Sequence, residues 1–471
     1  GIHPRMRLCL VYLLVFFVYC SGSMAMTVEV LPYSGELKVT VLDADFSPNP
    51  LPINLARTHN GKVLFDGPLG IGWQHSHEFF LADETPESML LALPGQVLIP
   101  LTRSATDINK YHSSRNGATL VKETDKQIVH FANGIVFTFS LNGLLTRIDL
   151  PTASLQYSYE QGRLKNVMGS LGDTIEFSYS KTGKLTGTIT SQGDQTTYSY
   201  DDNHRLNAVS YNGVVTENYD YDESGRLVGV KLNSGETWKI QRDELFRVSE
   251  LLGPKGVART YAYEDDAQSE KFFIFGDNGG MTRLERSLDS SLIVIKDVLG
   301  GVIEHNIVNG KLATSTDPLG RLSRYTFDPA GRLTEIVDPL GRKLTRTYFE
   351  ETELVASEID YTGQSISTEF NDLKLPVRIS DSVRGTRTLE YDSKGRIVRV
   401  QDFDGQVTKF EYDQGWIPNR ILDQRGIVGE ILFNETGKAV EIETGAGIWP
   451  LPKTDFASID VAIGDRSFAQ Q

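Results

Sequence analysis

One short stretch sets the pattern of this chain: Tyr221-Asp222-Glu223-Ser224-Gly225-Arg226-Leu227. Related copies are Phe327-Asp328-Pro329-Ala330-Gly331-Arg332-Leu333 and Tyr391-Asp392-Ser393-Lys394-Gly395-Arg396-Ile397. With the glycine as anchor, copies fall at positions 143, 162, 183, 204, 225, 246, 267, 290, 310, 331, 352, 373, 395, 415 and 437. These positions cover 294 residues in 14 steps, a period of about 21 residues, which is typical of repeat architectures.

The positions around each anchor repeat as well. An aromatic residue stands four before the anchor in most copies, as Tyr200 does before His204. In three copies it stands three before, at Tyr159, Phe370 and Tyr412, which we interpret as turns shortened by one residue. Lys or Arg usually follows the anchor, and Leu, Ile or Val comes next. The spacing holds where the glycine is lost, so it reflects a structural unit.

A second turn signal lies midway between anchors, as in Asp317-Pro318-Leu319-Gly320 and Asp338-Pro339-Leu340-Gly341. Asp, Pro and Gly each favour turn backbone for a different physical reason. Each unit therefore holds two turns and two stretches rich in Val, Ile, Thr and Tyr, which is a β-hairpin. We predict an all-β fold: a long antiparallel β-hairpin meander coiled into a spiral sheet or partial shell, with a β-rich N-terminal domain.

Charge excludes some partners. The chain has 471 residues, with 62 acidic and 47 basic side chains and a formal net charge of −15. Such a surface repels phosphate backbones and anionic lipids, so we expect no nucleic-acid partner and no binding to an anionic membrane surface.

The N-terminal segment resembles a secretory signal. Arg5 and Arg7 precede thirteen apolar residues, 8–20, and small residues precede a cleavage position after Ala25. We therefore predict a signal peptide over 1–25, export by a Sec-type route, a periplasmic, extracellular or cell-surface location, and no membrane span after signal removal. A lipid anchor on Cys20 and an uncleaved anchor are the alternatives. Cleavage removes both cysteines, which excludes a disulfide scaffold and a thiol nucleophile.

The region before the array carries its own motif. The range 67–78 reads G-P-L-G-I-G-W-Q-H-S-H-E, and the range 51–60 reads L-P-I-N-L-A-R-T-H-N. The motif positions that we single out are Gly67, Pro68, Gly70, Gly72, Trp73 and His75. We predict an opening domain over 27–140, a hairpin array over 141–440, and an irregular tail over 441–471.

These motifs together resemble the YD-repeat (Rhs-repeat) family over about residues 27–440. Aromatic-Asp-x-x-Gly-Arg-Leu at a period near 21 is similar to its repeat, and the 67–78 motif is similar to the G-P-L-G-x-G-W-x-H-S-Y-E signature of its opening domain. His77 stands where that family usually has Tyr. The resemblance implies a spiralling β-sheet shell that encloses a protein segment or serves as an extracellular scaffold.

The resemblance implies a further feature of the toxic members of the family: a self-cleaving core with a D-P-x-G-L motif follows the repeats, and a toxin follows the core. Here 34 residues follow Gly437 and contain no such motif, and the D-P-L-G turns of the array continue with Arg. We therefore expect neither self-cleavage nor a toxin from this chain. We expect a protein partner instead, such as a separately encoded Rhs core or toxin.

Other chemistry has weaker support. On a strand, His75 and His77 share one face, which could begin a metal site, but no third ligand is placed by the sequence. Asp43-Ala44-Asp45 and Asp201-Asp202-Asn203 lack a calcium-loop pattern. Most carboxylates stand at turns, where they cap the backbone. The Arg or Lys after each anchor is expected to be solvated or to pair with these carboxylates.

The function that the sequence favours is an exported, non-enzymatic scaffold or shell that holds or binds another polypeptide, without a cofactor. The first alternative is a cell-surface carbohydrate-binding adhesin, since the repeated aromatic residues could stack on glycans. Their recurrence at one structural position favours a packed ladder instead. The second alternative is a metal-dependent hydrolase in the opening domain, centred on His75 and His77.

Overall fold

The fold was taken from a computed structural model. It describes residues 17–19, 26–44, 53–61, 65–95, 97–113, 117–131, 135–149, 154–170, 172–352, 354–413, 418–433, 439–444 and 447–450. Most of the predicted signal peptide, the anchors at 415 and 437, and residues 451–471 of the tail lie outside these ranges. Only Phe17–Tyr19 of the signal region are placed, as β1 beside β2.

Strands dominate the described residues, as the alternating sequence predicts. The described residues hold no α-helix, and one 3-10 turn, η4 (Pro254–Gly256), stands among the strands. The prediction of an all-β hairpin meander is therefore confirmed.

A small sheet opens the described chain, with the strand order β1-β2-β3-β4-β7. Alternate residues of β3 are fully buried, so one face of this sheet belongs to the core. A separate ribbon pairs β5 with β6. The bounds are β1 (Phe17–Tyr19), β2 (Met26–Val30), β3 (Leu37–Ala44), β4 (Leu55–Asn60), β5 (Asp66–Gly67), β6 (Gly70–Ile71) and β7 (Trp73–His75).

The main sheet runs in chain order from β8 to β44, and each strand pairs antiparallel with the next. Its first strands are β8 (Phe80–Thr85), β9 (Ser88–Leu93), β10 (Val97–Arg103), β11 (Lys110–His112), β12 (Thr119–Lys122), β13 (Lys126–His130), β14 (Val136–Ser140) and β15 (Leu145–Asp149). The sheet thus begins within the range 27–140. The predicted boundary near residue 140 stays a prediction.

The repeat region follows without a break in the ladder. Its first half consists of β16 (Ser154–Glu160), β17 (Arg163–Gly169), β18 (Thr174–Tyr179), β19 (Leu185–Thr190), β20 (Gln195–Tyr200), β21 (Leu206–Tyr211), β22 (Val214–Tyr221), β23 (Leu227–Leu232), β24 (Thr237–Arg242), β25 (Val248–Leu252), β26 (Ala258–Asp265), β27 (Ser269–Gly276) and β28 (Met281–Ser287).

The second half repeats the same hairpins. Its strands are β29 (Leu292–Lys296), β30 (Val302–Val308), β31 (Lys311–Thr316), β32 (Leu322–Phe327), β33 (Leu333–Val337), β34 (Lys343–Tyr348), β35 (Val355–Ile359), β36 (Ser365–Phe370), β37 (Pro376–Asp381), β38 (Gly385–Tyr391), β39 (Ile397–Gln401), β40 (Val407–Glu411), β41 (Arg420–Asp423), β42 (Gly426–Phe433), β43 (Ala439–Thr444) and β44 (Gly447–Pro450).

A β-bulge precedes most anchor turns. The register shifts directly before Tyr200, Tyr221 and Tyr391, for example. Bulges increase the right-handed twist of a strand pair and bend it. A bulge repeated in successive units therefore coils the ribbon.

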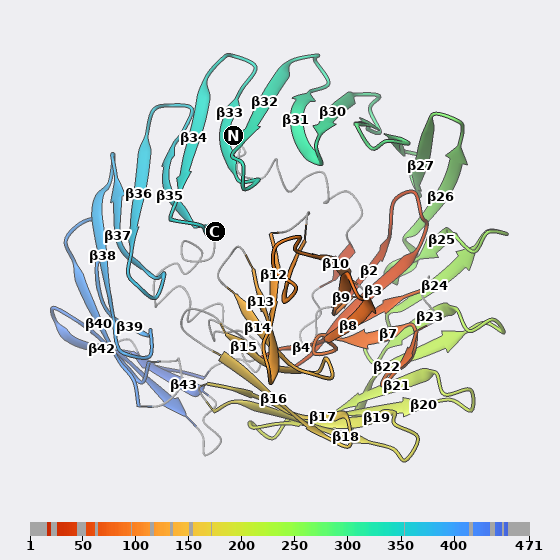
Figure 1. The fold of residues 1–471 in the computed structure, drawn as a ribbon, viewed down its shortest axis with the longest axis horizontal. Helices are drawn as coiled ribbons and strands as arrows, with labels where there is room; N and C mark the ends of the chain where they lie inside the picture. Colours follow the sequence, from red (N-terminus) through yellow and green to blue (C-terminus); the bar gives the residue numbers. More distant parts are fainter. Residues whose placement is uncertain are drawn as a thin grey trace.

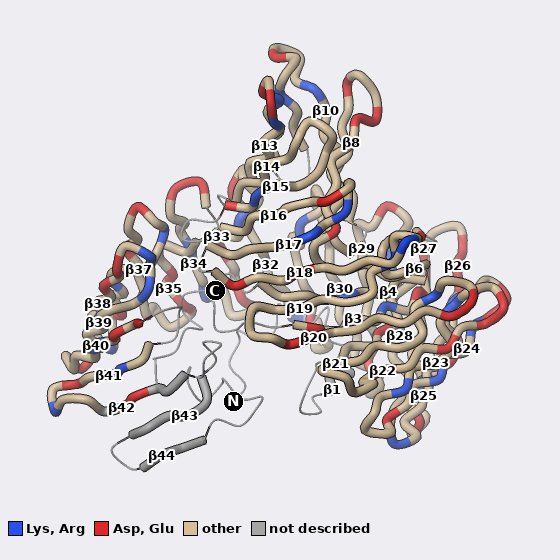
Figure 2. The backbone as a smooth tube through the Cα atoms, turned by 90° about the horizontal axis from the view of Figure 1, so that it is seen from below, with Lys and Arg blue, Asp and Glu red and all other residues tan. Residues whose placement is uncertain are grey.

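The coiled ribbon forms a ring when viewed along its short axis, with β2–β15 inside the ring on the side of β16–β27 (Figure 1). From the side, β40 and β41 lie well below β13–β17, so the ribbon winds as a spiral (Figure 2). Within the described ranges, no strand register joins β44 to β8, so the sheet is open. Its first edge is instead covered locally, because Leu81 N donates to Gly143 O at 3.1 Å.

Three anchors differ from their predicted positions. The left-handed residue is Lys374 rather than Leu373, so Phe370 stands four before it and the shortened turn predicted there is wrong. The sequence assigned the anchor by spacing alone, whereas the turn begins at Asn371, whose carbonyl accepts from Lys374 N. In the turn around Thr352, the left-handed residue is Glu350. In the turn at Ala267, no residue has a positive φ. The shortened turn after Tyr159 is confirmed, because Glu160 pairs directly with Arg163.

Candidate functional site

The anchor turn closes each hairpin with its own aspartate. Asp201 Oδ1 accepts from the backbone N–H groups of Asn203 and Arg205, both at 2.9 Å, and Oδ2 accepts from Arg205 Nε at 2.8 Å. The same Asp–Arg pair closes the turns at Arg332 and Arg396. The basic residue after the anchor is thus a partner of the turn carboxylate in these units.

The anchor residue itself takes the left-handed conformation. Gly225, Gly331 and Gly395 have φ values between 80° and 82°. His204 and Phe246 adopt φ values of 60° and 62° at the same place, although residues with a side chain seldom do so. At these two positions the repeat therefore imposes the turn even though the glycine is lost.

The aromatic residue before the anchor ties one unit to the unit before it. Its hydroxyl donates to the backbone carbonyl of the residue fifteen positions earlier, at 2.5–2.7 Å. The tyrosines that do so are Tyr179, Tyr200, Tyr221, Tyr263, Tyr348, Tyr391 and Tyr412. In one unit that lacks this tyrosine, Arg242 donates to Leu227 O at 2.6 Å instead.

The basic residue of one unit also lies over the aromatic ring of the next. Arg226 stands 3.6 Å from the ring centre of Phe246, Arg332 4.8 Å from that of Tyr348, and Arg396 4.6 Å from that of Tyr412. Phe327 has Lys311 in this place, at 5.8 Å. Each of these cation–π contacts occupies one face of the ring. The repeated aromatic residues therefore form a lattice between units.

The Gly-rich opening motif docks on the inside of this lattice. Pro68 O accepts from Leu185 N at 2.7 Å and from the Tyr200 hydroxyl at 3.1 Å. Gly67 O accepts from Lys184 Nζ at 2.9 Å. Gly70 has a φ of 82°, and a Cβ there would lie 2.8 Å from His204 O. Glycine is needed at this point because two backbones approach so closely.

Trp73 is the aromatic anchor of the motif. It is fully buried, its ring lies edge-on to that of Tyr219 at 4.8 Å, and its indole N–H donates to the Tyr221 hydroxyl at 2.9 Å. Gly72, with a φ of 83°, leaves room for His59. The opening motif and the repeat motif therefore meet directly at Tyr221.

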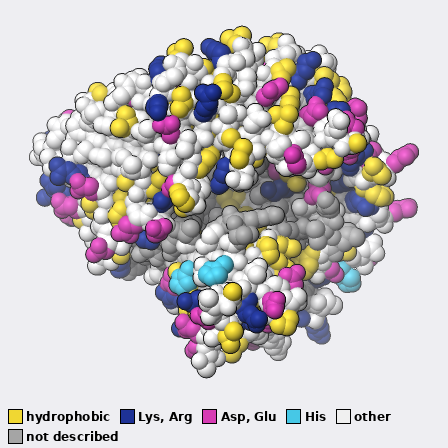
Figure 3. All heavy atoms as spheres, turned by 45° about the horizontal axis from the view of Figure 1, so that its top comes forward, with side chains coloured by type: hydrophobic (Ala, Val, Ile, Leu, Met, Phe, Trp, Pro, Cys, Tyr) yellow, Lys and Arg dark blue, Asp and Glu magenta, His cyan; other side chains and the backbone are white. Residues whose placement is uncertain are grey.

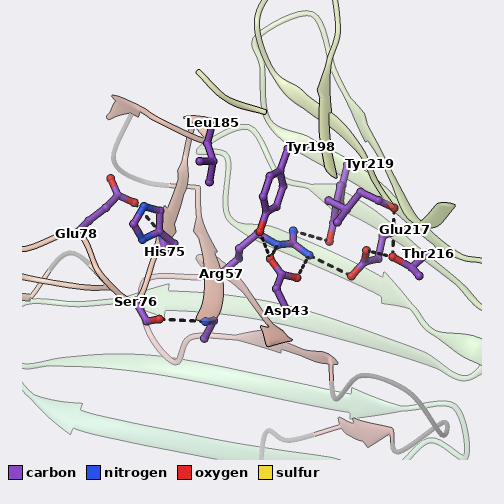
Figure 4. Close-up of polar contacts among 12 residues, drawn as sticks. Asp43, Arg57, His75, Ser76, Glu78, Leu185, Tyr198, Thr216, Glu217 and Tyr219 are labelled. Atoms are coloured by element: carbon purple, nitrogen blue, oxygen red, sulfur yellow. Dashed lines mark hydrogen bonds and ion pairs between the residues drawn. The ribbon is translucent and has the colours of Figure 1, made fainter. Parts of the chain in front are cut away.

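A buried charge network joins the same surfaces (Figure 4). Arg57 is 0% exposed and donates through Nε and Nη2 to both oxygens of Asp43, at 2.5 and 2.9 Å. Nη2 also contacts Glu217 Oε1 at 3.1 Å, and Nη1 contacts the Tyr219 hydroxyl at 3.2 Å. The Tyr198 hydroxyl donates to Asp43 at 2.6 Å. Desolvation raises the pKa of Glu217, and the charge of Arg57 opposes that rise.

The sequence analysis did not predict this charge network as a site, although the position of Arg57 in its strand indicates it. Arg57 stands in phase with the buried residues Leu55 and His59 of β4, so its side chain must face the core. A buried arginine requires carboxylate partners. Asp43, which the sequence offers as a weak calcium ligand, is one of these partners.

His75 and His77 are both buried beside β16 and β18, where His75 lies 5.4 Å from the ring of Phe177. The His77 ring nitrogens contact the Tyr157 hydroxyl at 3.0 Å and Asn54 O at 2.6 Å. His75 Nδ1 accepts from His77 N at 3.1 Å. Within the described residues, no group of three His, Cys, Asp or Glu side chains is arranged to hold a metal ion.

Burial shifts the titration of this cluster. It lowers the pKa of His75 to about 3, with a further contribution from His77, and that of His77 to about 4. Burial also lowers the pKa of His59 to about 3. Burial raises the pKa of Glu78 to about 8, although its carboxylate accepts from His75 N at 2.6 Å. At neutral pH the histidines are therefore uncharged, and Glu78 is largely protonated.

No helix in the described ranges is both long and apolar enough to cross a membrane.

Comparisons with known proteins match the repeat lattice. The RHS Repeat family matches residues 179–215 and 308–343. The toxin protein Tse5 of Pseudomonas aeruginosa is 28% identical over 204 residues, which cover 42% of this chain and 15% of Tse5. The crystal structure of TcdB2-TccC3 without its hypervariable C-terminal region matches with a TM-score of 0.48 at 12% identity. It covers 88% of this chain and 27% of that one.

A second structure, of TcdB2-TccC3, matches with a TM-score of 0.34 at 11% identity, over 89% of this chain and 30% of that one. The match therefore spans less than a third of each of these relatives.

Proposed function

Because this chain is an RHS-repeat protein, we propose that it serves as an exported, non-enzymatic scaffold or shell that holds another polypeptide against the inner face of its spiral. The observation that carries the proposal is the unequal covering of that inner face. The contacts of Pro68, Trp73, Arg57 and His77 described above all fall on the first half of the repeat region.

The inner face can be followed along the ladder through directly opposed residues. From Tyr219 it leads to Val230 and Trp238, which are 2% exposed. In the second half the same face continues through side chains that are mostly only half-buried. These include Tyr325, Leu344, Arg346, Glu358, Ile366, Thr368 and Leu389.

This half of the face has the chemistry of a polypeptide surface. Leu344 and Ile366 offer apolar contacts, and Arg346 is bound to Glu358 at 2.7 Å, which leaves the pair electrically neutral. Apolar patches that also carry fixed polar groups are typical of protein-binding surfaces. A separately encoded Rhs core or toxin is the partner that we propose, since the repeat relative is itself a toxin protein.

The test places a photo-crosslinking amino acid on each side of one strand. Ile366 lies on the inner face of β36, and its neighbour Ser367 is exposed on the outer face. Successive residues of a strand point to opposite faces, so the two positions are matched in all but direction. The chain is then expressed with its neighbouring genes and irradiated.

We expect a crosslinked polypeptide from position 366 and none from position 367. A second pair, Leu389 and Glu390 on β38, should behave in the same way. Adducts of equal yield from both faces, or none from either inner position, would contradict the proposal. Export is tested separately, by fractionating cells that express the chain with and without residues 1–25.

A further inference from the structure

Three successive turns on one edge of the second half carry a leucine that the fold does not use. Leu299, Leu319 and Leu340 are 93%, 76% and 75% exposed. They stand at the third position of the turns between β29 and β30, β31 and β32, and β33 and β34. Alternate turns lie on opposite edges of a meander, so these three share one edge. We call the three residues the leucine rim.

The turn needs nothing from these side chains. The backbone N–H of Leu319 donates to Asp317 Oδ1 at 3.0 Å, and that of Leu340 donates to Asp338 Oδ1 at 3.0 Å. Other turns hold the same bond with Asn203, Thr362 or Lys394 at this position. A polar residue therefore satisfies the turn, and repeated leucine has another cause.

The residues before Leu299 and Leu319 lie close to the preceding turn. A Cβ on Gly280 would lie 3.2 Å from Val298, and a Cβ on Gly301 would lie 3.2 Å from Pro318. Val298 and Pro318 therefore lie close to the backbone of the preceding turn, while the leucine beside each is exposed. Figure 3 turns this side of the ring forward and shows apolar side chains standing among charged ones.

From this geometry we propose that the leucine rim binds an amphipathic α-helix of a partner protein, with acidic residues beside its apolar stripe. Neighbouring rim leucines lie two strands apart, about 9.6 Å along the sheet. One heptad of a helix rises about 10.5 Å, so side chains at that spacing face the rim together. An extended strand repeats one face every ~6.7 Å and does not match.

Two exposed arginines beside the rim can bind the carboxylates of the acidic flank. Arg321 and Arg342 follow two of the leucines and have side chains that are 57% and 53% exposed. Arg321 binds Asp317 through Nε at 2.7 Å, and its two Nη groups form no further hydrogen bond or ion pair with a described residue. Guanidinium groups with outward donors bind carboxylates in a fixed geometry.

The size of the rim favours a helix over a second copy of this chain. A stable dimer buries about 20–30 residues on each side, whereas the rim offers three leucines and Val298, which is 61% exposed. A single helix can bind through so few side chains, because a few buried residues carry most of the binding energy of a small interface.

The experiment measures binding of the full chain to a synthetic fluorescent peptide by anisotropy. The peptide is a 21-residue helix with leucine at one position of each heptad and glutamate on both sides of that stripe. Its control is a peptide of the same composition without the heptad spacing. We expect Leu319→Ser and Leu340→Ser to weaken binding at least about tenfold each. Arg321→Glu should weaken it by a similar factor.

The matched control is Leu245→Ser. Leu245 is 69% exposed at the same turn position, with its N–H bonded to Asp243, but it lies on the opposite edge of the sheet. Its substitution should leave binding unchanged. Equal binding of both peptides, equal effects of all leucine variants, or no binding to the unaltered chain would overturn the proposal. So would a dimer of the chain that Leu319→Ser dissociates.

Discussion

Arg57 shows how one buried side chain joins two parts of the chain. It lies on β4 of the opening sheet, and its partner Glu217 lies on β22 of the repeat region, 160 residues later. Neither charge reaches water, so each depends on the other for its solvation. The same surface holds uncharged histidines and a protonated Glu78, which makes it sensitive to pH.

We predict that Arg57→Leu lowers the free energy of unfolding by about 3–5 kcal/mol, because it leaves Asp43 and Glu217 buried without a counter-charge. Urea denaturation measures the loss. Arg321→Leu removes an exposed pair with Asp317 and should cost less than about 1 kcal/mol. Adding Asp43→Asn and Glu217→Gln to Arg57→Leu should restore part of the stability. A loss as small as that of Arg321→Leu would contradict the prediction.

The raised pKa of Glu78 predicts a loss of stability in mild base. The folded state holds this proton up to a pKa of about 8, whereas the unfolded chain releases it near 4.5. The contribution of Glu78 is therefore complete below pH 4.5 and is lost as the pH rises to 8. Between pH 6.5 and 8 we expect the free energy of unfolding to fall by about 2 kcal/mol.

Glu78→Gln keeps an acceptor for His75 N and removes the titration. Its stability should not change between pH 6.5 and 8 through this group, and urea denaturation at each pH measures the difference. The lowered pKa values of His59, His75 and His77 act in the opposite direction, since their contribution is present above pH 6.5 and is lost toward pH 3–4. An identical slope in both proteins above pH 6.5 would refute the assignment to Glu78.

At the scale of the element, the hairpin is specified almost entirely by local sequence. The period located the left-handed residue at His204 and Phe246, because the turn aspartate and the basic and apolar residues after these positions remained. At Leu373 the period placed the left-handed residue one position too early, because the turn begins at Asn371, which replaces the usual aspartate. Contacts such as Trp73 with Tyr221 were not predicted, because no periodic pattern encodes a meeting of distant strands.

The start of the main sheet depends on one such meeting. Gly143 has a φ of 84°, and a Cβ there would lie 2.0 Å from Leu81 O, the carbonyl of the first strand. Gly225 has the same conformation with no atom closer than 3.9 Å to the added Cβ. Substituting each glycine therefore distinguishes the cost of the left-handed conformation, present at both positions, from the cost of the close approach to Leu81, present only at Gly143.

We predict that Gly225→Ala destabilises the chain by about 1–2 kcal/mol, which is the cost of the left-handed conformation. Gly143→Ala should cost a further ~1–3 kcal/mol, because the methyl group displaces β8 from the turn after β14. Denaturation gives both values, and hydrogen exchange of β8 should accelerate only in Gly143→Ala. Equal losses would show that the contact with Leu81 does not hold this edge.

At the scale of the whole molecule, the spiral is one continuous sheet with two different halves. Bulges before the anchor turns coil it, and the tyrosine and arginine lattice links each unit to the next. Repeat proteins of this kind draw stability from each unit and its neighbours, so local stability varies along the chain. In the first half, the opening sheet adds a second layer to that lattice.

This difference predicts unequal hydrogen exchange. Strands β18, β20 and β24 each alternate fully buried with exposed residues, whereas β32 and β36 hold half-buried residues on the inner face. Amide protection follows the free energy of local opening, which falls where fewer apolar side chains are buried. Peptides from β18–β24 should therefore exchange at least about tenfold more slowly than peptides from β32–β36, as measured by mass spectrometry.

The same measurement distinguishes a filled spiral from an empty one. A polypeptide held against the second half would raise the protection of β32–β36 and leave β18–β24 unchanged, since the opening sheet already covers that half. A helix on the leucine rim would instead protect the turns at Leu319 and Leu340 and not the strand centres. Uniform protection of both halves in the isolated chain would mean that the opening sheet contributes no stability to the strands it covers, and the division of the inner face would lose its physical basis.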